Sequence, residues 1–321
     1  MSRYSNFLRI SSSFLGSAAI GRPMVWGLPF SIGLELTNHC NLRCPHCASG
    51  AGLSKRDKGF MSTDLFLKIR EELAGTLFAT VLYFQGESMM HPGFFEILKL
   101  AEGMNPQIST NGHFLDSDSC AKLALIHKGE IIVSLDGLSE ESYTAYRKGG
   151  DLQKVKKGIE CLAEEIKQKR SRARLVLQVL VNSYNEHELS DIKDFAFGMN
   201  ARLRLKSMQL IDNDDQAGFL PGDKKFRRYS IKDGLLQRKG SIKGACFRLW
   251  TNPVISWDGK VLPCCFDKDA EYIMGDLNSQ SFREIWNSEN YRAFRTDILH
   301  NRAGIEICRN CTEGLPVWIR R

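Results

Sequence analysis

The chain has 321 residues, of which 43% are hydrophobic, and it carries a formal net charge of +7. This length and composition allow a sizeable buried core in one large domain and a small one. The ten cysteines argue against a disulfide framework, because seven of them sit in close groupings that suit metal binding. The sequence therefore predicts a cytoplasmic protein in a reducing compartment. Basic residues with interleaved aromatics are too sparse to indicate a nucleic-acid partner.

Residues 1–30 are predicted to be an N-terminal extension. Arg3 and Arg9 precede a mildly apolar stretch at residues 14–20, a pattern that resembles a weak secretion signal. We reject that interpretation because Ser17 interrupts the stretch and Gly21 bounds it. No run of about 18 apolar residues occurs, so no transmembrane segment is expected. A short helix that covers the main domain or touches a membrane surface is the better interpretation, and its apolar positions are Phe7, Leu8, Ile10, Phe14 and Leu15.

Through residues 31–210, short apolar runs alternate with segments of helical period, which is typical of repeated βα units on a parallel sheet. Strands are predicted at residues 32–36, 80–84, 107–110, 131–135, 175–181 and 203–207. Helices are predicted at residues 63–73, 94–101, 116–127, 152–169 and 186–199, with Ser62 and Asp116 as N-caps. Six such units predict an α/β fold built on an open, partial (β/α)6 barrel rather than a closed barrel of eight.

The segment from Cys40 to Cys47 carries three thiols, Cys40, Cys44 and Cys47, at C-x3-C-x2-C spacing. Three thiolates can hold three corners of a cubane iron-sulfur cluster and leave its fourth iron open for a substrate. A structural zinc loop is the alternative, but such loops usually pair C-x2-C with a second C-x2-C or with histidines.

The run from Leu34 to Cys47 closely resembles the cluster motif of the radical S-adenosylmethionine superfamily. Further blocks of the chain resemble that family in the right order: Gln85-Gly86-Glu87, Thr110-Asn111-Gly112 and Ser134-Leu135-Asp136-Gly137. Gln85 departs from the family pattern, which more often has glycine there. The resemblance implies the same open (β/α)6 shape.

The resemblance also implies the chemistry. The open iron would bind S-adenosylmethionine, and one electron from an external donor such as flavodoxin or ferredoxin would split its sulfonium. The product would be a 5′-deoxyadenosyl radical that takes hydrogen from a substrate. Ser134 can equally cap its strand, and Arg147 can equally be a solvated residue at a helix end. The residues expected to bind the cofactor by this resemblance are His46, Gln85, Gly86, Glu87, Asn111, Ser134 and Arg147.

These blocks share one position relative to the predicted strands. Cys40 follows the first strand, Glu87 the second, Asn111 the third and Asp136 the fourth. In barrels the catalytic groups gather at the carboxyl ends of the strands. The pattern therefore places the site on one rim of the barrel.

Beyond the predicted barrel the pattern changes. Residues 211–245 are polar and without period, and they are interpreted as a linker or a substrate-facing loop. Residues 246–321 are interpreted as a small α+β domain, with a tight hairpin turn at residues 257–260. Its cysteines partly resemble the auxiliary-cluster domains of the SPASM and twitch subfamilies, although a full SPASM domain has about seven. One auxiliary four-iron cluster is expected, with structural zinc as the alternative, and its ligands would be Cys246, Cys264, Cys308 and Cys311.

Neighbouring residues on a strand point to opposite faces, so only one of Cys264 and Cys265 can face a cluster. Cys264 keeps the family spacing from Gly259. Cys265 is then a packed thiol or a catalytic hydrogen-atom donor. Cys120 and Cys161 sit in helical patterns and are expected to fill the core.

The leading hypothesis for the reaction is oxidation or radical rearrangement of a small polar substrate such as a carbohydrate or cyclitol, with the auxiliary cluster relaying an electron. Lys206, at the end of the sixth strand, is a candidate base or anchor, and Asp212 and Asp214 are candidates for binding hydroxyl groups. A radical S-adenosylmethionine peptide maturase or epimerase is the alternative. Such relatives usually carry a leader-binding extension before the barrel, and the thirty-residue start is expected to be too short for one. A third hypothesis is a non-catalytic iron-sulfur or zinc protein that binds a partner.

Overall fold

A computed structural model describes residues 2–126, 128–211, 217–232, 235–240, 242, 244–311 and 318–320. The chain forms two compact units, each assembled from separate stretches of sequence. Unit 1 comprises Met1–His39, Ser54–Gln107 and Ser241–Glu313, and unit 2 comprises Cys40–Leu53, Ile108–Gly240 and Gly314–Arg321. The predicted boundaries at residues 30, 210 and 245 remain predictions.

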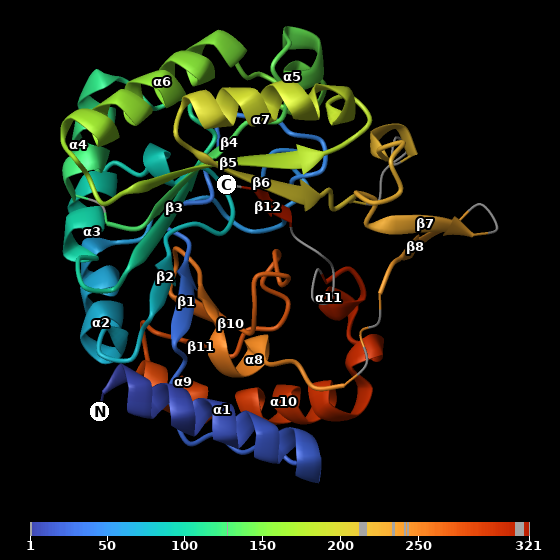
Figure 1. Cartoon of the computed structure of the whole chain (residues 1–321). Coiled ribbons are helices and arrows are strands. Elements are labelled where there is room, and N and C mark those ends of the chain that lie inside the picture. Colours follow the sequence, from blue (N-terminus) through green and yellow to red (C-terminus); the bar gives the residue numbers. More distant parts are fainter. Residues whose placement is uncertain are drawn as a thin grey trace. The chain divides into compact units, whose positions relative to one another are not determined.

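The sheet of unit 1 is built around β1, which lies between two parallel neighbours (Figure 1). The next two strands, β10 and β11, are antiparallel and continue the sheet beyond β9. Gly259 occupies the turn between β9 and β10 with φ of +86°, a backbone conformation that glycine adopts without strain, and the predicted hairpin is confirmed. The strands are β1 (Ser31–Leu34), β2 (Ala79–Val81), the first part of β3 (Pro106–Thr110), β9 (Val254–Ile255), β10 (Lys260–Leu262) and β11 (Gly275–Asp276).

The helices of unit 1 begin at short polar caps. The Ser62 hydroxyl accepts the N–H of Leu65 at the start of α2, as predicted, and Ser281 forms a reciprocal capping box with Glu284 at the start of α9. The elements are α1 (Arg3–Ile20), α2 (Thr63–Leu73), η1 (Ser88–Met90), α3 (Phe94–Leu100), α8 (Arg248–Thr251), α9 (Phe282–Trp286), α10 (Glu289–Asn301), η4 (Arg302–Gly304) and α11 (Glu306–Arg309). The N-terminal helix α1 has 18 residues and is therefore longer than the short helix expected from the sequence.

In unit 2 the last part of β3 is followed by three parallel strands in sequence order, and β12 is antiparallel to the last of them. The connecting helices α4 and α6 pack against each other (Figure 1). The strands are β4 (Glu130–Ser134), β5 (Arg174–Val181), β6 (Arg202–Ser207) and β12 (Trp318–Arg320), with a separate hairpin of β7 (Tyr229–Lys232) and β8 (Leu235–Arg238). The helices are α4 (Ser117–Ile126), α5 (Glu140–Tyr146), α6 (Leu152–Gln168), η2 (Glu186–Glu188), α7 (Leu189–Gly198) and η3 (Ala217–Phe219).

The predicted alternation of strands and helices is confirmed, with differences confined to element ends and to two omissions. Helix α5 was not predicted, although Ser139 caps it, because its seven residues show too little period. The β7–β8 hairpin falls inside the stretch predicted to be without structure. Among the described residues, no helix is long and apolar enough to cross a bilayer.

Candidate functional site

The three-cysteine loop of unit 2 is closed by its own backbone. The N–H of Cys47 donates to the carbonyl of Cys44 over 3.2 Å, and the N–H of Ala51 donates to the carbonyl of Cys47 over 2.8 Å. A Cβ on Gly50 would lie 2.7 Å from the backbone nitrogen of Cys44. Glycine at position 50 therefore allows the loop to fold back onto the thiols.

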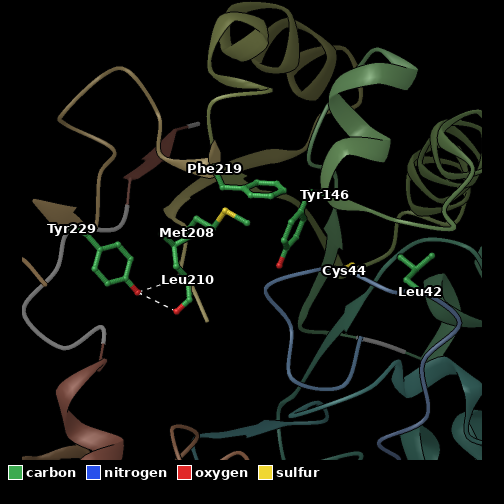
Figure 2. Packing of buried hydrophobic residues seen from close by; sticks show 7 residues of the cluster. All are labelled: Leu42, Cys44, Tyr146, Met208, Leu210, Phe219 and Tyr229. Atoms are coloured by element: carbon green, nitrogen blue, oxygen red, sulfur yellow. Dashed lines mark hydrogen bonds between the residues drawn. The ribbon is translucent and has the colours of Figure 1, made fainter. Parts of the chain in front are cut away.

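The loop rests on an apolar cluster of buried residues (Figure 2). Leu42 and Cys44 are buried in this cluster, and the half-buried Cys40 and Cys47 pack against it. All three thiols therefore lie at one apolar surface, where water has restricted access. The remaining buried members come from α5 and from the stretch after β6, and they are Tyr146, Met208, Leu210, Phe219 and Tyr229.

Arg147 links the loop to the end of β4. Its Nε and Nη2 both lie 2.6 Å from Oδ2 of the fully buried Asp136, and its Nη1 lies 3.9 Å from the sulfur of Cys44. The N–H of Leu180 donates to the other oxygen of Asp136 over 2.6 Å. Burial raises the pKa of the Cys44 thiol to about 11, although the Arg147 charge opposes this shift. A cation beside a buried thiol favours the thiolate, which is the form that binds iron.

The block after β3 also contacts the cysteine loop. The side-chain amide of Asn111 donates to the side-chain oxygen of Asn41 over 2.7 Å. The Asn111 oxygen accepts the backbone N–H of His113 and lies 3.0 Å from its Nδ1, while Nε2 of His113 accepts the N–H of Asp151. Burial lowers the pKa of His113, so the neutral ring donates from Nδ1 and accepts at Nε2. This network positions Asn41, which lies between Cys40 and Cys44.

Three other predicted site residues of unit 2 have distinct surroundings. His46 is buried, its ring meets Phe219 edge to face at 4.8 Å between centroids, and its Nδ1 lies 3.3 Å from the N–H of Ile211. Ser134 is buried at the end of β4, and Lys206 is half-buried next to the last residue of β6. Asp212 and Asp214 lie outside the described residues.

In unit 1 the block Gln85-Gly86-Glu87 packs against the backbone just before Cys40. A Cβ on Gly86 would lie 2.6 Å from the carbonyl oxygen of His39, and Gly86 has φ of +76°. The N–H of Glu87 donates to the same carbonyl over 2.8 Å. The carboxylate of the buried Glu87 accepts the N–H of Met89 and caps η1. Glycine is therefore required at position 86, because the backbone of His39 approaches it closely. Position 85 accommodates a glutamine side chain where the family more often has glycine.

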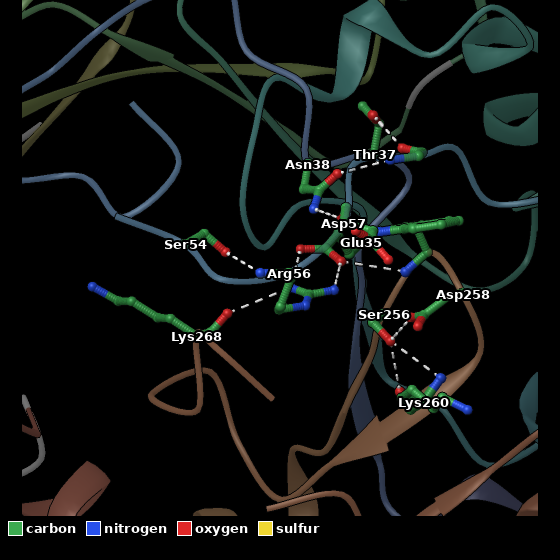
Figure 3. Close-up of polar contacts among 12 residues, drawn as sticks. Glu35, Thr37, Asn38, Ser54, Arg56, Asp57, Ser256, Asp258, Lys260 and Lys268 are labelled. Carbon is green, nitrogen blue, oxygen red and sulfur yellow. Dashed lines mark hydrogen bonds and ion pairs between the residues drawn. The ribbon is translucent and has the colours of Figure 1, made fainter. Parts of the chain in front are cut away.

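A buried ion pair ties the end of β1 to the C-terminal part of unit 1 (Figure 3). The guanidinium of Arg56 donates to both oxygens of Glu35, which is fully buried, and to the carbonyl of Lys268. Glu35 also accepts the N–H of Trp257 over 3.3 Å. The sequence offered no signal for this pairing because the two charges are separated by 21 residues without a common motif.

The four cysteines expected to hold an auxiliary cluster line one cavity in unit 1. Cys246 precedes α8, Cys308 lies in α11, and the N–H of Cys311 donates to the carbonyl of Cys308 over 3.1 Å. Burial raises the pKa of the Cys264 thiol. The remaining wall includes Leu249, Phe266, Phe294 and Ile298, so the cavity is closed mainly by apolar side chains. The four residues are Cys246, Cys264, Cys308 and Cys311.

Cys265 has a different environment from its neighbour. It does not line this cavity, and its sulfur lies 3.6 Å from Nη1 of Arg248. Burial alone would lower the pKa of the Arg248 guanidinium. The negative charges of the Cys265 and Cys264 thiolates act in the other direction, and the net pKa is raised. The predicted strand is not present here, because β10 ends at Leu262 and both cysteines lie in the bend and turn that follow it. Cys264 lines the cavity as expected, and a catalytic role for Cys265 remains a prediction.

The donor set suits iron-sulfur clusters in both places. Thiolate is the ligand that such clusters prefer, and here the thiols gather on apolar surfaces with a cation nearby. Among the described residues, no group of three or more histidine, cysteine, aspartate or glutamate side chains is arranged to hold a metal ion.

Sequence reasoning missed several residues that shape the site. Asp136 stands in a block singled out for its family resemblance, but its pairing with Arg147 crosses a turn and a helix. His113 lies two residues beyond Asn111. Its position just after a predicted strand end is the only sequence feature that could have indicated a role in the site. Tyr146 and Phe219 carry no motif at all and are found only from packing.

Comparison with known protein families identifies two domains. The radical SAM superfamily model matches residues 34–196, just over half of the chain, and the model of the SPASM iron-sulfur cluster-binding domain matches residues 246–312.

Three curated relatives illustrate the range of similar proteins. The tungsten-containing aldehyde ferredoxin oxidoreductase cofactor-modifying protein of Pyrococcus furiosus is 26% identical over 296 residues, covering 82% of each chain. The mycofactocin maturase MftC of Mycobacterium ulcerans is 31% identical over 183 residues, covering 56% of this chain and 48% of the relative. The PqqA peptide cyclase of Rhodopseudomonas palustris is 27% identical over 296 residues, covering 82% of this chain and 74% of the relative.

Solved structures share the fold at lower identity. Streptococcus suis SuiB bound to S-adenosylmethionine aligns with a TM-score of 0.66 at 12% identity, covering 90% of this chain and 73% of that one. Native anSMEcpe with bound AdoMet aligns with a TM-score of 0.63 at 17% identity, covering 89% of both chains. The predicted α/β fold with a C-terminal iron-sulfur domain is confirmed. The chain belongs to the radical S-adenosylmethionine superfamily of enzymes and carries a SPASM domain at its C-terminal end.

Proposed function

We propose that this enzyme modifies a peptide by radical chemistry. Two of the relatives described above are named a maturase and a peptide cyclase, and the PqqA peptide cyclase is similar over 82% of this chain. The observation that carries the proposal is this similarity across both the barrel region and the C-terminal domain. The small polar substrate expected from the sequence is therefore not our leading choice.

The radical SAM domain implies a four-iron cluster with S-adenosylmethionine, and the SPASM domain implies auxiliary iron-sulfur chemistry. When bound, the first cluster and its cofactor supply a carbon radical able to remove hydrogen from an unactivated C–H bond. Enzymes of this family also need an external one-electron donor. A reducing, cytoplasmic setting suits such clusters and is part of the proposal.

We assign the first cluster to the three-thiol loop because its apolar base excludes water and its cation, Arg147, favours thiolate. The auxiliary cluster is assigned to the four-cysteine cavity of unit 1. Glu87 is proposed to bind the cofactor's ammonium group, since a buried carboxylate makes a strong charge-assisted hydrogen bond. The other proposed contacts to the cofactor are those of His46, Gln85, Gly86, Asn111, Ser134 and Arg147.

A second candidate function is modification of a small organic cofactor. It is favoured by the Pyrococcus furiosus relative, which is named a cofactor-modifying protein and matches 82% of both chains. In that case Lys206 is the proposed base or anchor for the substrate.

One labelling experiment distinguishes the two candidates. A lysate of bacteria grown in heavy water is separated by mass into a peptide fraction and a small-molecule fraction. Each fraction is incubated anaerobically with the reconstituted enzyme, S-adenosylmethionine and dithionite. The mass of the released 5′-deoxyadenosine then reports which fraction gave up deuterium.

The peptide proposal predicts deuterated 5′-deoxyadenosine from the peptide fraction alone. Deuterium that comes only from the small-molecule fraction would replace it with the second candidate. Cys44→Ala is expected to abolish the product, while Cys161→Ala, which changes a cysteine of α6 away from both thiol groups, is the matched control.

A further inference from the structure

The N-terminal helix α1 packs both polar and apolar side chains against the protein, and its Phe14 contacts Phe247 and Trp250. Its inward face carries three fully buried polar side chains, Asn6, Ser13 and Ser17, beside Ile10. A helix on the surface of a soluble domain normally buries its apolar stripe and exposes its polar one. In α1 three of the four fully buried positions are polar, and several large apolar side chains remain on the outward face.

The side chains of Asn6 and Ser17 are hydrogen-bonded inside unit 1. The Asn6 amide donates to the carbonyl of Leu28 and accepts its N–H, each over 2.8 Å. The Ser17 hydroxyl accepts the N–H of Met24 over 2.7 Å and donates to the carbonyl of Ser13 over 2.6 Å. These bonds fix the rotation of α1 about its axis, because any turn of the helix would leave the buried groups without partners.

The outward face carries large apolar side chains on both sides of the exposed Ser12. Tyr4, Leu8 and Leu15 lie on one side of α1 at spacings of four and seven residues, and they are 71%, 65% and 66% exposed. Ile20, at the end of the helix, is 66% exposed, and the nearby Trp26 is 55% exposed. Single exposed apolar residues are ordinary, but several large ones on the same helix face mark an interaction surface.

The N-terminal segment that contains α1 carries only basic charges. No aspartate or glutamate occurs before Glu35, whereas Arg9 and Arg22 are exposed. Arg9 also lines a cavity of about 310 Å³ together with Trp26, Arg283 and Asn287. Within the described residues, neither the Arg9 nor the Arg283 guanidinium makes a hydrogen bond or an ion pair. Two such cations beside an indole are suited to an anionic headgroup next to an apolar phase.

We propose that α1 is an interfacial anchor that lies on an anionic lipid bilayer. The stripe of Tyr4, Leu8 and Leu15 enters the boundary between headgroups and acyl chains, as interfacial helices do. Arg9 and Arg283 bind lipid phosphates at the cavity, and Trp26 sits at headgroup depth. The helix lies on the membrane and does not cross it, and the proposal is independent of which substrate the enzyme modifies.

Sedimentation with vesicles tests the anchor using the reconstituted full chain under anaerobic conditions. Vesicles of phosphatidylcholine alone are compared with vesicles of equal parts phosphatidylcholine and phosphatidylglycerol. The protein is expected to sediment with the anionic vesicles and to be released by salt, because screening weakens charge attraction. Leu8→Ser with Leu15→Ser is expected to lower the partition coefficient at least about tenfold. Arg9→Gln with Arg283→Gln is expected to lower it about fivefold per charge.

The matched control replaces exposed apolar residues elsewhere. Leu125→Ser with Phe197→Ser, on α4 and α7 of unit 2, should leave the partition coefficient unchanged. All substituted leucines are largely exposed, so the variants should fold, and far-ultraviolet circular dichroism checks this. The proposal is overturned if the wild-type chain stays in the supernatant with anionic vesicles, or if the α1 double variant binds as well as the wild type. A dimer in solution that this variant dissociates would instead assign the face to a second copy of the chain.

Discussion

At the residue scale, the pair of Arg147 and Asp136 connects a strand end to the three-thiol loop. Asp136 is fully buried, and the Arg147 side chain is only 13% exposed. The Arg147 guanidinium lies beside the Cys44 sulfur. Its charge is buried, so it is stable at this position only while the Asp136 carboxylate balances it. We therefore regard Asp136 as a positioning residue for Arg147 and, through it, for the loop.

Asp136→Asn is expected to destabilise the protein by about 3 kcal/mol, because it leaves a buried guanidinium without a counter-charge. Asp118→Asn is the matched control: it breaks the ion pair with Lys122, which lies on the exposed surface of α4, and should cost less than about 0.5 kcal/mol. Anaerobic urea unfolding at equal iron content measures both. Equal effects of the two substitutions would show that the buried pair has no special contribution.

His113 predicts a pH dependence of stability. Burial lowers its pKa in the folded chain below the ordinary value of 6.5. Below pH 6.5 the unfolded chain therefore binds a proton that folded His113 does not bind. The contribution of neutral His113 to the free energy of unfolding is present above pH 6.5. It is lost as the pH falls from 6.5 toward the lowered pKa of His113 in the folded chain. His91, whose pKa burial also lowers, acts in the same direction.

His113→Gln should make the free energy of unfolding less dependent on pH below 6.5, because glutamine does not titrate and can still accept the N–H of Asp151. Urea unfolding at a series of pH values measures the slope. A variant slope as steep as that of the wild type would assign the acid sensitivity to other groups.

At the scale of elements, the loop after β2 meets the end of the β1 segment through glycine. Gly86→Ala is expected to destabilise the protein by at least about 2 kcal/mol, because it combines a positive φ with a Cβ 2.6 Å from the His39 carbonyl. Gly103→Ala is the matched control, with φ of +89° and open space around its Cβ, and should cost about 1 kcal/mol. Thermal unfolding compares them. A larger loss for Gly103→Ala would contradict the close-approach argument.

The elements differ in how far their sequences predict them. The parallel strands carry apolar residues at buried positions and were recognisable from them, as the long apolar run of β5 illustrates. The hairpin of β7 and β8 was missed because Ser230, Ile231 and Lys232 are all exposed and no alternation marks a buried face.

In the candidate site, too, some features could be predicted from the sequence and others could not. The cysteine spacing at positions 40, 44 and 47 is local and was recognisable from the sequence alone. The contacts of Arg147 with Asp136 and of Arg56 with Glu35 join residues across turns and long loops, so no sequence period reports them. The choice of Cys264 over Cys265 agrees with the cavity lining, but its premise of strand alternation was wrong, because both residues follow the end of β10.

At the scale of the whole molecule, the account requires two iron-sulfur clusters. Anaerobically reconstituted wild-type protein should hold about eight iron atoms per chain, and both Cys44→Ala and Cys308→Ala should hold about four. Cys161→Ala should keep eight. Iron and acid-labile sulfide analyses measure these values. A wild-type content near four, or a Cys308→Ala variant that keeps all its iron, would remove the auxiliary cluster from the account.

The central claim is that the three-thiol loop makes this chain a radical S-adenosylmethionine enzyme. The most direct test is release of 5′-deoxyadenosine from S-adenosylmethionine by the reconstituted protein with dithionite, followed by chromatography and mass spectrometry. We predict steady release by the wild type and by Cys161→Ala, and none by the Cys40, Cys44 and Cys47 triple alanine variant. Intact wild-type protein with its iron bound that releases no 5′-deoxyadenosine, or a triple variant that releases as much as the wild type, would contradict the account.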